Sequence, residues 1–133
     1  MGIVLWQKAY SVGNEQIDNE HKVFVEIIGR IHDAVLKKKS IDYIKRLLRE
    51  LEAYAVFHFV SEENIMIDSA FPELEEHKKE HEKLLNALDI KVKKITSFEE
   101  VPDTLIFFLI NWFVEHTTSR DLELAKHLRN NVS

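Results

Sequence analysis

Seven histidines stand out in a chain of 133 residues that contains no cysteine. His58 and Glu62 are four residues apart, and His77 and His81 have the same spacing. If these segments are helical, each pair lies one turn apart on one face of its helix. Such pairs of nitrogen and oxygen donors are suited to holding a metal ion.

Three more residues extend this donor set. His116 and Asp121 are five residues apart, which corresponds to about 7.5 Å along a helix axis, and inward-leaning side chains can bring them to one centre. His21 lies near the start of the chain. The chain thus offers five imidazoles and two carboxylates, each within or beside an apolar stripe.

Imidazole nitrogen and carboxylate oxygen without sulfur suit iron, zinc, copper or manganese. The set exceeds the four ligands of a tetrahedral zinc ion. Two six-coordinate metals can share it if both carboxylates and one exogenous oxygen bridge them, and these negative ligands also offset the charge of the buried cations. The stoichiometry therefore favours a dinuclear site. We interpret His32 and His127 as ordinary structural histidines rather than as ligands.

Apolar residues recur with a period near 3.6. Residues typical of helix ends divide the chain into four helical segments after an N-terminal arm. Asp18 and Ser40 are the expected N-caps of the first two helices, Pro72 opens the third, and Ser97 with Glu100 has capping-box spacing before the fourth. We expect one domain over residues 1–133, with the arm over 1–16 and helices over roughly 17–38, 41–66, 72–95 and 101–130. Short connections between the helices predict an all-α, up-down-up-down four-helix bundle.

The composition excludes several classes of protein. Apolar residues make up 45% and charged residues 31%, which is typical of a globular protein rather than a disordered or membrane-embedded one. The net charge of −5 argues against nucleic acid or anionic lipid as the main partner. Without cysteine there is no disulfide, thiolate zinc site, iron–sulfur cluster or cysteine nucleophile. The apolar run over 3–6 is too short for a signal peptide, so we expect a cytoplasmic protein with no membrane contact.

Four motifs, spread along the chain, carry a family resemblance. They are Trp6 … Val12-Gly13 … Ile17-Asp18 … His21-Lys22, then His58-Phe59-Val60-Ser61-Glu62-Glu63 with Met66, then Phe71-Pro72 with His77 … His81, and finally Trp112-Phe113-Val114-Glu115-His116 followed by Asp121. With these motifs the sequence resembles the hemerythrin family, specifically its bacterial single-domain members, from Trp6 to about Leu124.

The resemblance implies a non-haem di-iron centre with an oxo or hydroxo bridge between the irons. The implied ligands are His77, His81 and His116 on one iron, His21 and His58 on the other, and Glu62 and Asp121 as bridges. It further implies that dioxygen binds reversibly, as hydroperoxide, at the second iron, which keeps one position open. No substrate is turned over, so we expect an oxygen-binding protein for storage, delivery or scavenging and not an enzyme. We expect Glu63, about 100° around the helix from Glu62, to face solvent.

An apolar wall is expected around the bound oxygen, where it keeps bulk water away. The residues expected to form it are Phe24, Phe59, Trp112, Phe113 and Thr117. Three nearby positions depart from the family pattern. Phe113 stands where leucine is usual, Thr117 where isoleucine is usual, and Leu84 where an aromatic residue is frequent.

Three other functions are also compatible with a helical bundle that carries these ligands. Hemerythrin domains also act as oxygen or redox sensors when they are fused to signalling modules. Ferritin-like bundles are di-iron oxidases or peroxidases, but they use Glu-x-x-His pairs, and this sequence contains none. A mononuclear zinc bundle would leave part of the donor set unused.

Overall fold

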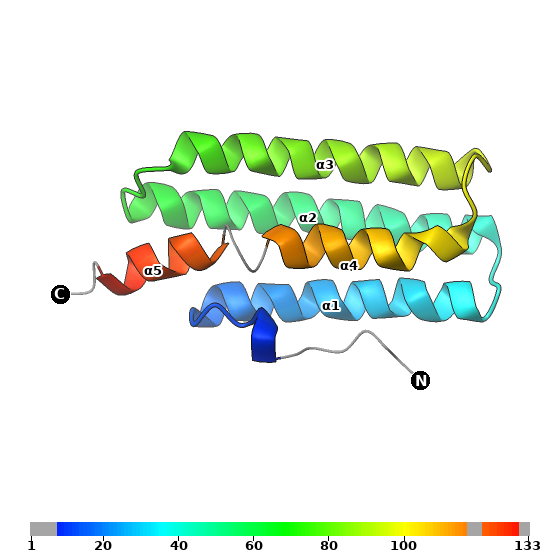
Figure 1. Ribbon diagram of the computed structural model, residues 1–133, viewed down its shortest axis with the longest axis horizontal. Helices are drawn as coiled ribbons and strands as arrows, with labels where there is room; N and C mark the ends of the chain where they lie inside the picture. Colours follow the sequence, from blue (N-terminus) through cyan, green and yellow to red (C-terminus); the bar gives the residue numbers. More distant parts are fainter. Residues whose placement is uncertain (1–7, 117–120, 131–133) are drawn as a thin grey trace.

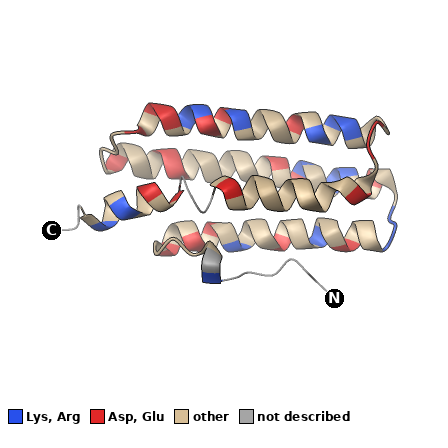
Figure 2. Cartoon of the chain, in the orientation of Figure 1, with Lys and Arg blue, Asp and Glu red and all other residues tan. Residues whose placement is uncertain are grey.

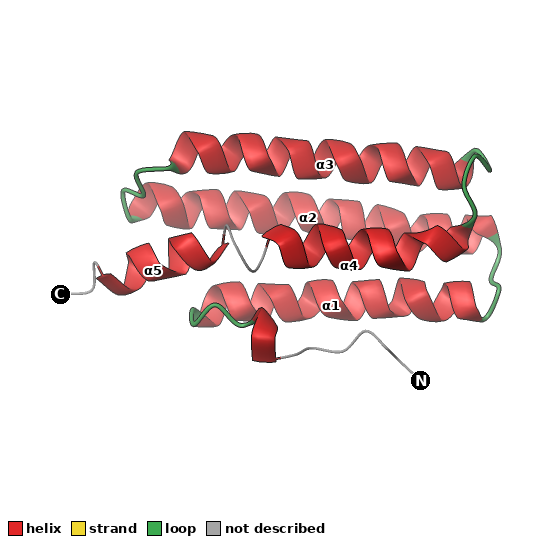
Figure 3. Cartoon of the chain, in the orientation of Figure 1, coloured by secondary structure: helices red, strands yellow, loops and turns green. Residues whose placement is uncertain are grey.

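The computed structural model describes residues 8–116 and 121–130, and the regular elements in these ranges are all helical (Figure 3). The α-helices are α1 (Glu15–Leu36), α2 (Ile41–Asp68), α3 (Leu74–Thr96), α4 (Leu105–Glu115) and α5 (Leu122–Asn130), and two short 3₁₀ helices are η1 (Lys8–Tyr10) and η2 (Pro102–Thr104). Figure 1 shows α1, α2, α3 and α4 lying side by side with alternating chain direction, while α5 extends beyond the end of α4.

Helix α1 begins two residues earlier than the sequence predicted. Its N-cap is Asn14, whose side-chain oxygen accepts a hydrogen bond from the Ile17 amide at 3.0 Å. The prediction that Asp18 caps this helix was wrong. Its carboxylate accepts instead from the Val12 amide at 2.8 Å and the Ser11 hydroxyl at 2.7 Å, so it ties the N-terminal arm to the helix. Helix α2 has Ser40 as its N-cap, as expected.

The boundaries of the later helices also differ from the prediction. Helix α3 begins at Leu74 rather than at Pro72. Ser97 is the C-cap of α3, and Glu100 pairs with the Lys91 ammonium group. The predicted capping box is therefore absent, because both of its residues are engaged in ending α3. Pro102 starts the 3₁₀ helix that leads into α4.

Within the single fourth helix expected over 101–130, the structure describes η2, α4 and α5, and residues 117–120 lie outside the described ranges. His116 and Asp121, which border the undescribed residues 117–120, both have π-helical geometry. Residues five apart on a regular α-helix point about 140° away from each other. A π-helical turn bonds residue i to i+5 and is frequent at functional sites. Nε2 of His116 and Oδ1 of Asp121 lie 2.9 Å apart, so the two side chains converge.

The hydrophobic core consists of two clusters. The larger cluster fills the space among α1, α2, α3 and α4, and includes the fully buried Ile28, Leu48, Leu88 and Leu109. The smaller cluster lies toward the other end of the helices and brings α5 and the arm together; it contains Val12, Ile17, Met66, Phe71, Leu124 and Ala125. Most of the predicted ligands fall in the sequence between the residues of these two clusters, and His58 is flanked by Ala55 and Phe59 of the larger one. The candidate site is thus a polar layer between two apolar ones.

Charged residues are distributed unevenly over the helices. Figure 2 shows basic and acidic residues along α1, α2 and α3, whereas α4 has a single charged residue, Glu115. No helix in the described part of the chain combines the length and the apolar character that a membrane crossing requires.

The arm packs against α5 through a glycine that the geometry requires. Gly13 has a φ of +85°, in the left-handed region, and a Cβ atom at this position would lie 2.7 Å from Nη1 of Arg129. The same guanidinium nitrogen donates to the Val12 carbonyl at 3.1 Å. The positive φ strains any residue that has a side chain, and the Arg129 guanidinium would have to shift to make room for a Cβ atom.

Gly13→Ala is expected to lower the free energy of unfolding by about 1 to 2 kcal/mol, because alanine is strained at positive φ. Urea denaturation of the purified variant measures this change. Arg129→Ala combined with Gly13→Ala relieves the close contact but not the backbone strain, so part of the loss should persist. Unchanged stability of the single variant would contradict the described conformation of the arm.

Candidate metal centre

The buried polar side chains of the described residues coincide closely with the predicted ligands. At most 7% of the surface of each is exposed, and the set comprises His21, His32, His58, Glu62, His77, His81, His116 and Asp121. His32 is the one member that was not predicted as a ligand. The structure therefore buries all seven expected side chains in the interior of the bundle.

The first group of donors joins α1 and α2 to Asp121. Nε2 of His21 lies 2.7 Å from Oδ2 of Asp121 and 3.2 Å from Nε2 of His58. Nε2 of His58 lies 3.1 Å from Oε2 of Glu62, and Nε2 of His21 lies 3.8 Å from the same oxygen. These four side chains each place one donor atom within 4.8 Å of the others, close enough to share one cation.

The second group joins α2 and α3 to His116. Oε1 of Glu62 lies 3.0 Å from Nε2 of His81 and 3.3 Å from Nε2 of His116. Nε2 of His116 lies 2.9 Å from Oδ1 of Asp121. Glu62, His81 and His116 form a second set whose donor atoms are within reach of one cation.

Both carboxylates are shared between the two groups, with one oxygen directed to each. Glu62 points Oε2 toward His58 and Oε1 toward His81. Asp121 points Oδ2 toward His21 and Oδ1 toward His116. This is the arrangement that two carboxylates bridging two neighbouring cations require.

His77 is buried beside these groups but does not join either of them. Its ring centroid lies 6.3 Å from that of His81 and 5.0 Å from that of Phe71, and only 1% of its surface is exposed. Its donor atoms instead come within 4.8 Å of carboxylate oxygens of Glu73 and Glu123. His77 thus lies in the polar layer with the other predicted ligands. Its side-chain conformation, however, keeps it apart from His81 and His116.

The carboxylates reverse the usual effect of burial on the imidazoles. Burial disfavours the charged form of His58, but Glu62 and Glu20 outweigh it and raise its pKa to about 9. Burial likewise opposes the charged form of His116, and Asp121 and Glu62 raise its pKa to about 10. Burial would raise the pKa of Glu62, yet the surrounding imidazoles hold it well below its usual value. The carboxylates thus favour the charged form of His58 and His116, and a bound cation would supply the same positive charge.

The net pKa shifts of His21 and His77 have opposite directions, although burial disfavours the charged form of both. Burial acts against the charged form of His21, but the neighbouring Asp121 and Glu62 outweigh it and raise its pKa. For His77, burial dominates and lowers the pKa. A neutral imidazole has a free lone pair, which is the form that binds metal.

Several buried donor atoms have no hydrogen-bond partner among the described residues. In the two groups and His77 these atoms are the imidazole nitrogens His21 Nδ1, His77 Nδ1 and Nε2, and His116 Nδ1, whereas Glu62 Oε2 and Asp121 Oδ1 and Oδ2 each face an imidazole nitrogen at 2.7 to 3.1 Å. An unpartnered buried polar atom costs about 1 to 3 kcal/mol, so such a concentration calls for a ligand. Carboxylate oxygens and imidazole nitrogens without thiolate fit iron, zinc, copper or manganese.

Two carboxylates outside the layer contact its imidazoles. Oε1 of Glu20 lies 2.6 Å from Nδ1 of His58, and Oε2 of Glu63 lies 2.8 Å from Nδ1 of His81. The prediction that Glu63 faces solvent was wrong, since only 23% of its side chain is exposed. A residue next to an inward-facing ligand is turned by about 100°, which in a bundle directs it to the adjacent helix.

Glu20 was not singled out from the sequence. It directly precedes His21 on α1, but its partner ring belongs to α2. The available signal is its position beside a predicted ligand on a helix with close neighbours. That signal did not identify the ring that Glu20 contacts, because the contact crosses between helices.

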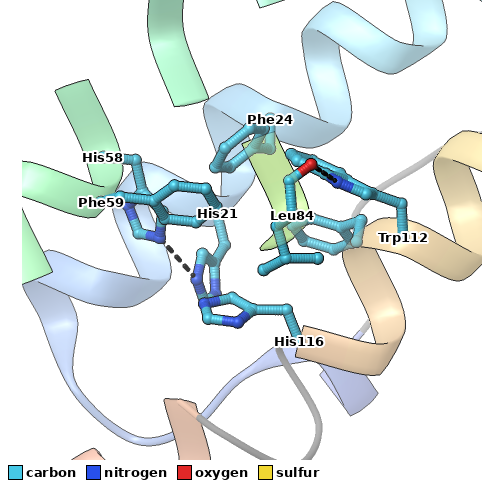
Figure 4. A pocket seen from close by; sticks show the side chains of 8 residues that line it. His21, Phe24, His58, Phe59, Leu84, Trp112 and His116 are labelled. Atoms are coloured by element: carbon cyan, nitrogen blue, oxygen red, sulfur yellow. Dashed lines mark hydrogen bonds between the residues drawn. The ribbon is translucent and has the colours of Figure 1, made fainter. Parts of the chain in front are cut away.

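An apolar pocket adjoins the first group (Figure 4). It has room for about 10 Å³ and is lined by His21, Phe24, His58, Phe59, Leu84, Trp112, Phe113 and His116. Four of the five residues expected in the oxygen pocket are therefore together here. The fifth, Thr117, lies outside the described residues, as does Trp6 of the first motif. A space of this size holds roughly one water-sized molecule.

The wall of the pocket is fixed by contacts among its aromatic rings. Nε1 of Trp112 donates to the Leu84 carbonyl at 2.9 Å, which joins α4 to α3. The Tyr10 ring of the arm packs edge-on against Phe113, with centroids 5.4 Å apart. Phe113 in turn lies 5.5 Å from the ring of His21. These contacts place apolar rings between the imidazoles and the outside.

The two histidines excluded from the predicted ligand set lie apart from both groups. His32 is buried, and neither of its ring nitrogens has a hydrogen-bond partner among the described residues. Nε2 of His127 lies 2.9 Å from the carbonyl oxygen of Ser69. Neither residue belongs to a group of donors close enough to share a cation in the described part of the chain.

Trp112→Phe is expected to lower the free energy of unfolding by about 1 to 3 kcal/mol, through the lost hydrogen bond and the smaller ring. Chemical denaturation measures the change. Phe107→Leu is the matched control on α4, because Phe107 is 76% exposed and surface substitutions usually stay within about 0.5 kcal/mol. Equal losses in the two variants would contradict the role of Trp112 in the wall.

The comparisons with known proteins agree with this geometry. Residues 12–128 match the family model "Hemerythrin HHE cation binding domain". The chain is 31% identical over 133 residues to a bacteriohemerythrin of Pseudomonas aeruginosa, covering 100% of this chain and 86% of the relative. It is 26% identical over 124 residues to a bacteriohemerythrin of Clostridium acetobutylicum, covering 90% of this chain and 96% of the relative.

A solved structure shows the same fold. The crystal structure of a hemerythrin in which one leucine is replaced by alanine superposes with a TM-score of 0.84 at 28% identity, over 96% of this chain and 98% of the other. The family match covers both donor groups and the pocket. This chain belongs to the hemerythrin family of cation-binding domains.

Proposed function

We propose that this protein is a non-haem di-iron protein that binds dioxygen reversibly for storage, delivery or scavenging, and that it is not an enzyme. The observation that carries the proposal is the sharing of Glu62 and Asp121, each with one oxygen toward either imidazole group. A mononuclear zinc site would have no use for two such bridges.

The two groups support the following ligand assignment. His21 and His58 hold one iron, His81 and His116 hold the other, and the two shared carboxylates bridge them. His77 completes the second set, because its buried ring lies beside His81 with both nitrogens unpartnered among the described residues. The helices that carry these ligands form an up-down-up-down four-helix bundle with an N-terminal arm.

The iron pair, when bound, supplies the reversible binding of dioxygen. The protein supplies a small apolar pocket beside His21 and His58, the pair of imidazoles with fewer protein ligands around their metal. Phe24, Phe59 and Trp112 keep bulk water out of this space. Its volume of about 10 Å³ suits a diatomic molecule and excludes an organic substrate.

The experiment that tests the function is an optical titration of the anaerobically reduced, iron-loaded protein. Charge-transfer bands in the near ultraviolet are expected to appear with oxygen and to disappear when oxygen is removed, over repeated cycles. Bands that appear once, with steady consumption of oxygen and a reductant, would identify an oxidase or peroxidase instead. A spectrum that changes with the redox poise of the solution but not with oxygen would favour a function as a redox sensor.

We expect about two irons per chain, and Glu62→Ala or Asp121→Ala should lower the content to about one or less, since each removes a ligand from both metals. Metal analysis and the optical spectrum measure this. His32→Ala and His127→Ala are the matched controls and should leave both unchanged. Loss of the bands in a control variant, with the bands preserved in His21→Ala, would overturn the ligand assignment.

Removing the iron should lower the melting temperature, because the metals tie together residues from α1, α2, α3 and the region between α4 and α5. A ligand present at about a hundred times its dissociation constant adds about 2.7 kcal/mol, which corresponds to about 10 °C for a chain of this size. Calorimetry of the iron-loaded and chelator-treated proteins measures the shift. Equal melting temperatures would contradict the coupling.

A further inference from the structure

We propose that Glu20 and Glu63 are positioning residues of the centre, each of which holds one ligand imidazole by Nδ1 and strengthens it as a donor through Nε2. The inference deepens the proposed function and rests on it. In the first group the imidazole is His58, and in the second it is His81. Each metal would thereby receive one imidazole supported by an outer carboxylate.

Glu20 is fixed by contacts on both of its oxygens. Oε1 meets Nδ1 of His58 at 2.6 Å, while Oε2 accepts from the Ser61 hydroxyl at 2.8 Å and the Gln16 amide at 3.3 Å. The Tyr54 hydroxyl donates to the backbone carbonyl of Glu20 at 2.7 Å. These contacts join α1 to α2 and leave the carboxylate little freedom to turn away from the ring.

Glu63 makes the equivalent contact between α2 and α3. Its Oε2 meets Nδ1 of His81 at 2.8 Å, while Nε2 of the same ring faces Oε1 of Glu62 at 3.0 Å. The Phe59 ring stacks on His81 at a centroid distance of 4.2 Å and an interplanar angle of 8°. The Glu63 carboxylate fixes how the His81 ring is turned within the plane of that ring. The stacked Phe59 ring fixes the orientation of the plane itself.

The other three imidazoles of the layer lack such support. Nδ1 of His21, His77 and His116 has no hydrogen-bond partner among the described residues. The outer contacts of His58 and His81 are thus a selective feature, with one in each group. Both carboxylates lie at the edge of the layer, at 14% and 23% exposure, so their charge remains partly solvated.

The physical consequence is a stronger donor atom facing the metal. A ring that donates Nδ1–H to a carboxylate is held in the tautomer whose Nε2 lone pair is free, and the negative charge makes this nitrogen more basic. A more basic ligand stabilises the ferric state more than the ferrous state. Glu20 and Glu63 should therefore raise the affinity for iron and lower the reduction potential of the pair.

Glutamine and alanine variants separate charge from geometry. A glutamine at either position keeps an acceptor for Nδ1–H and removes only the charge, whereas alanine removes both. Glu82→Gln is the matched control, because Glu82 directly follows His81 in the sequence but is exposed. The readouts are ferrous iron affinity, by anaerobic competition with a chromophoric chelator, and the reduction potential of the iron-loaded protein.

We expect Glu20→Ala and Glu63→Ala to weaken iron affinity about 10- to 100-fold and the glutamine variants to weaken it less. Both glutamine variants should shift the reduction potential upward, with Glu82→Gln unchanged. A potential equal to that of the unaltered protein in both glutamine variants would overturn the inference, since a purely structural contact survives in them. Unaltered protein that binds no iron would overturn the proposed function as well.

Discussion

Everything in this structure is arranged around two carboxylates held inside an apolar bundle. Neither Glu62 nor Asp121 exposes any of its side chain. An isolated buried charge is too costly to retain, so it must be paired with groups of opposite charge. Imidazoles from α1, α2, α3 and the end of α4 surround the two carboxylates at 2.7 to 3.3 Å. This polar layer requires ligands from several helices, and it therefore determines how the helices align.

The apolar residues on either side of the layer hold it in place. The larger cluster packs the four long helices, and the smaller one joins α5 and the N-terminal arm to the opposite end. The position of Asp121 depends on the smaller cluster, because Asp121 lies immediately before α5 and Leu124 of α5 is fully buried in that cluster. The site thus lies between two packed regions, which limits the motion of its side chains and excludes solvent.

The two donor groups differ in their surroundings, although they share both carboxylates. The pocket lies against His21 and His58 and is bounded by aromatic rings, whereas His81 is covered by the stacked Phe59 and held by Glu63. Each group has one imidazole held by an outer carboxylate, and the groups differ in that two imidazoles of the first but only His116 of the second line the pocket. The arm contributes to this difference, since Tyr10 packs on Phe113 at the pocket wall.

The sequence by itself determined the donor set and the helical periodicity. Ligands spaced at four residues need only local geometry to share a face, and apolar stripes need only the helical repeat, so His58 with Glu62 and the helical class were predictable. Tertiary structure decided the contacts that cross between helices, including Glu20 with His58 and Glu63 with His81. It also decided that the side chains of His116 and Asp121 converge and that His77 stands apart. These outcomes depend on how neighbouring helices are rotated and on local departures from α-helical geometry, which residue spacing does not specify.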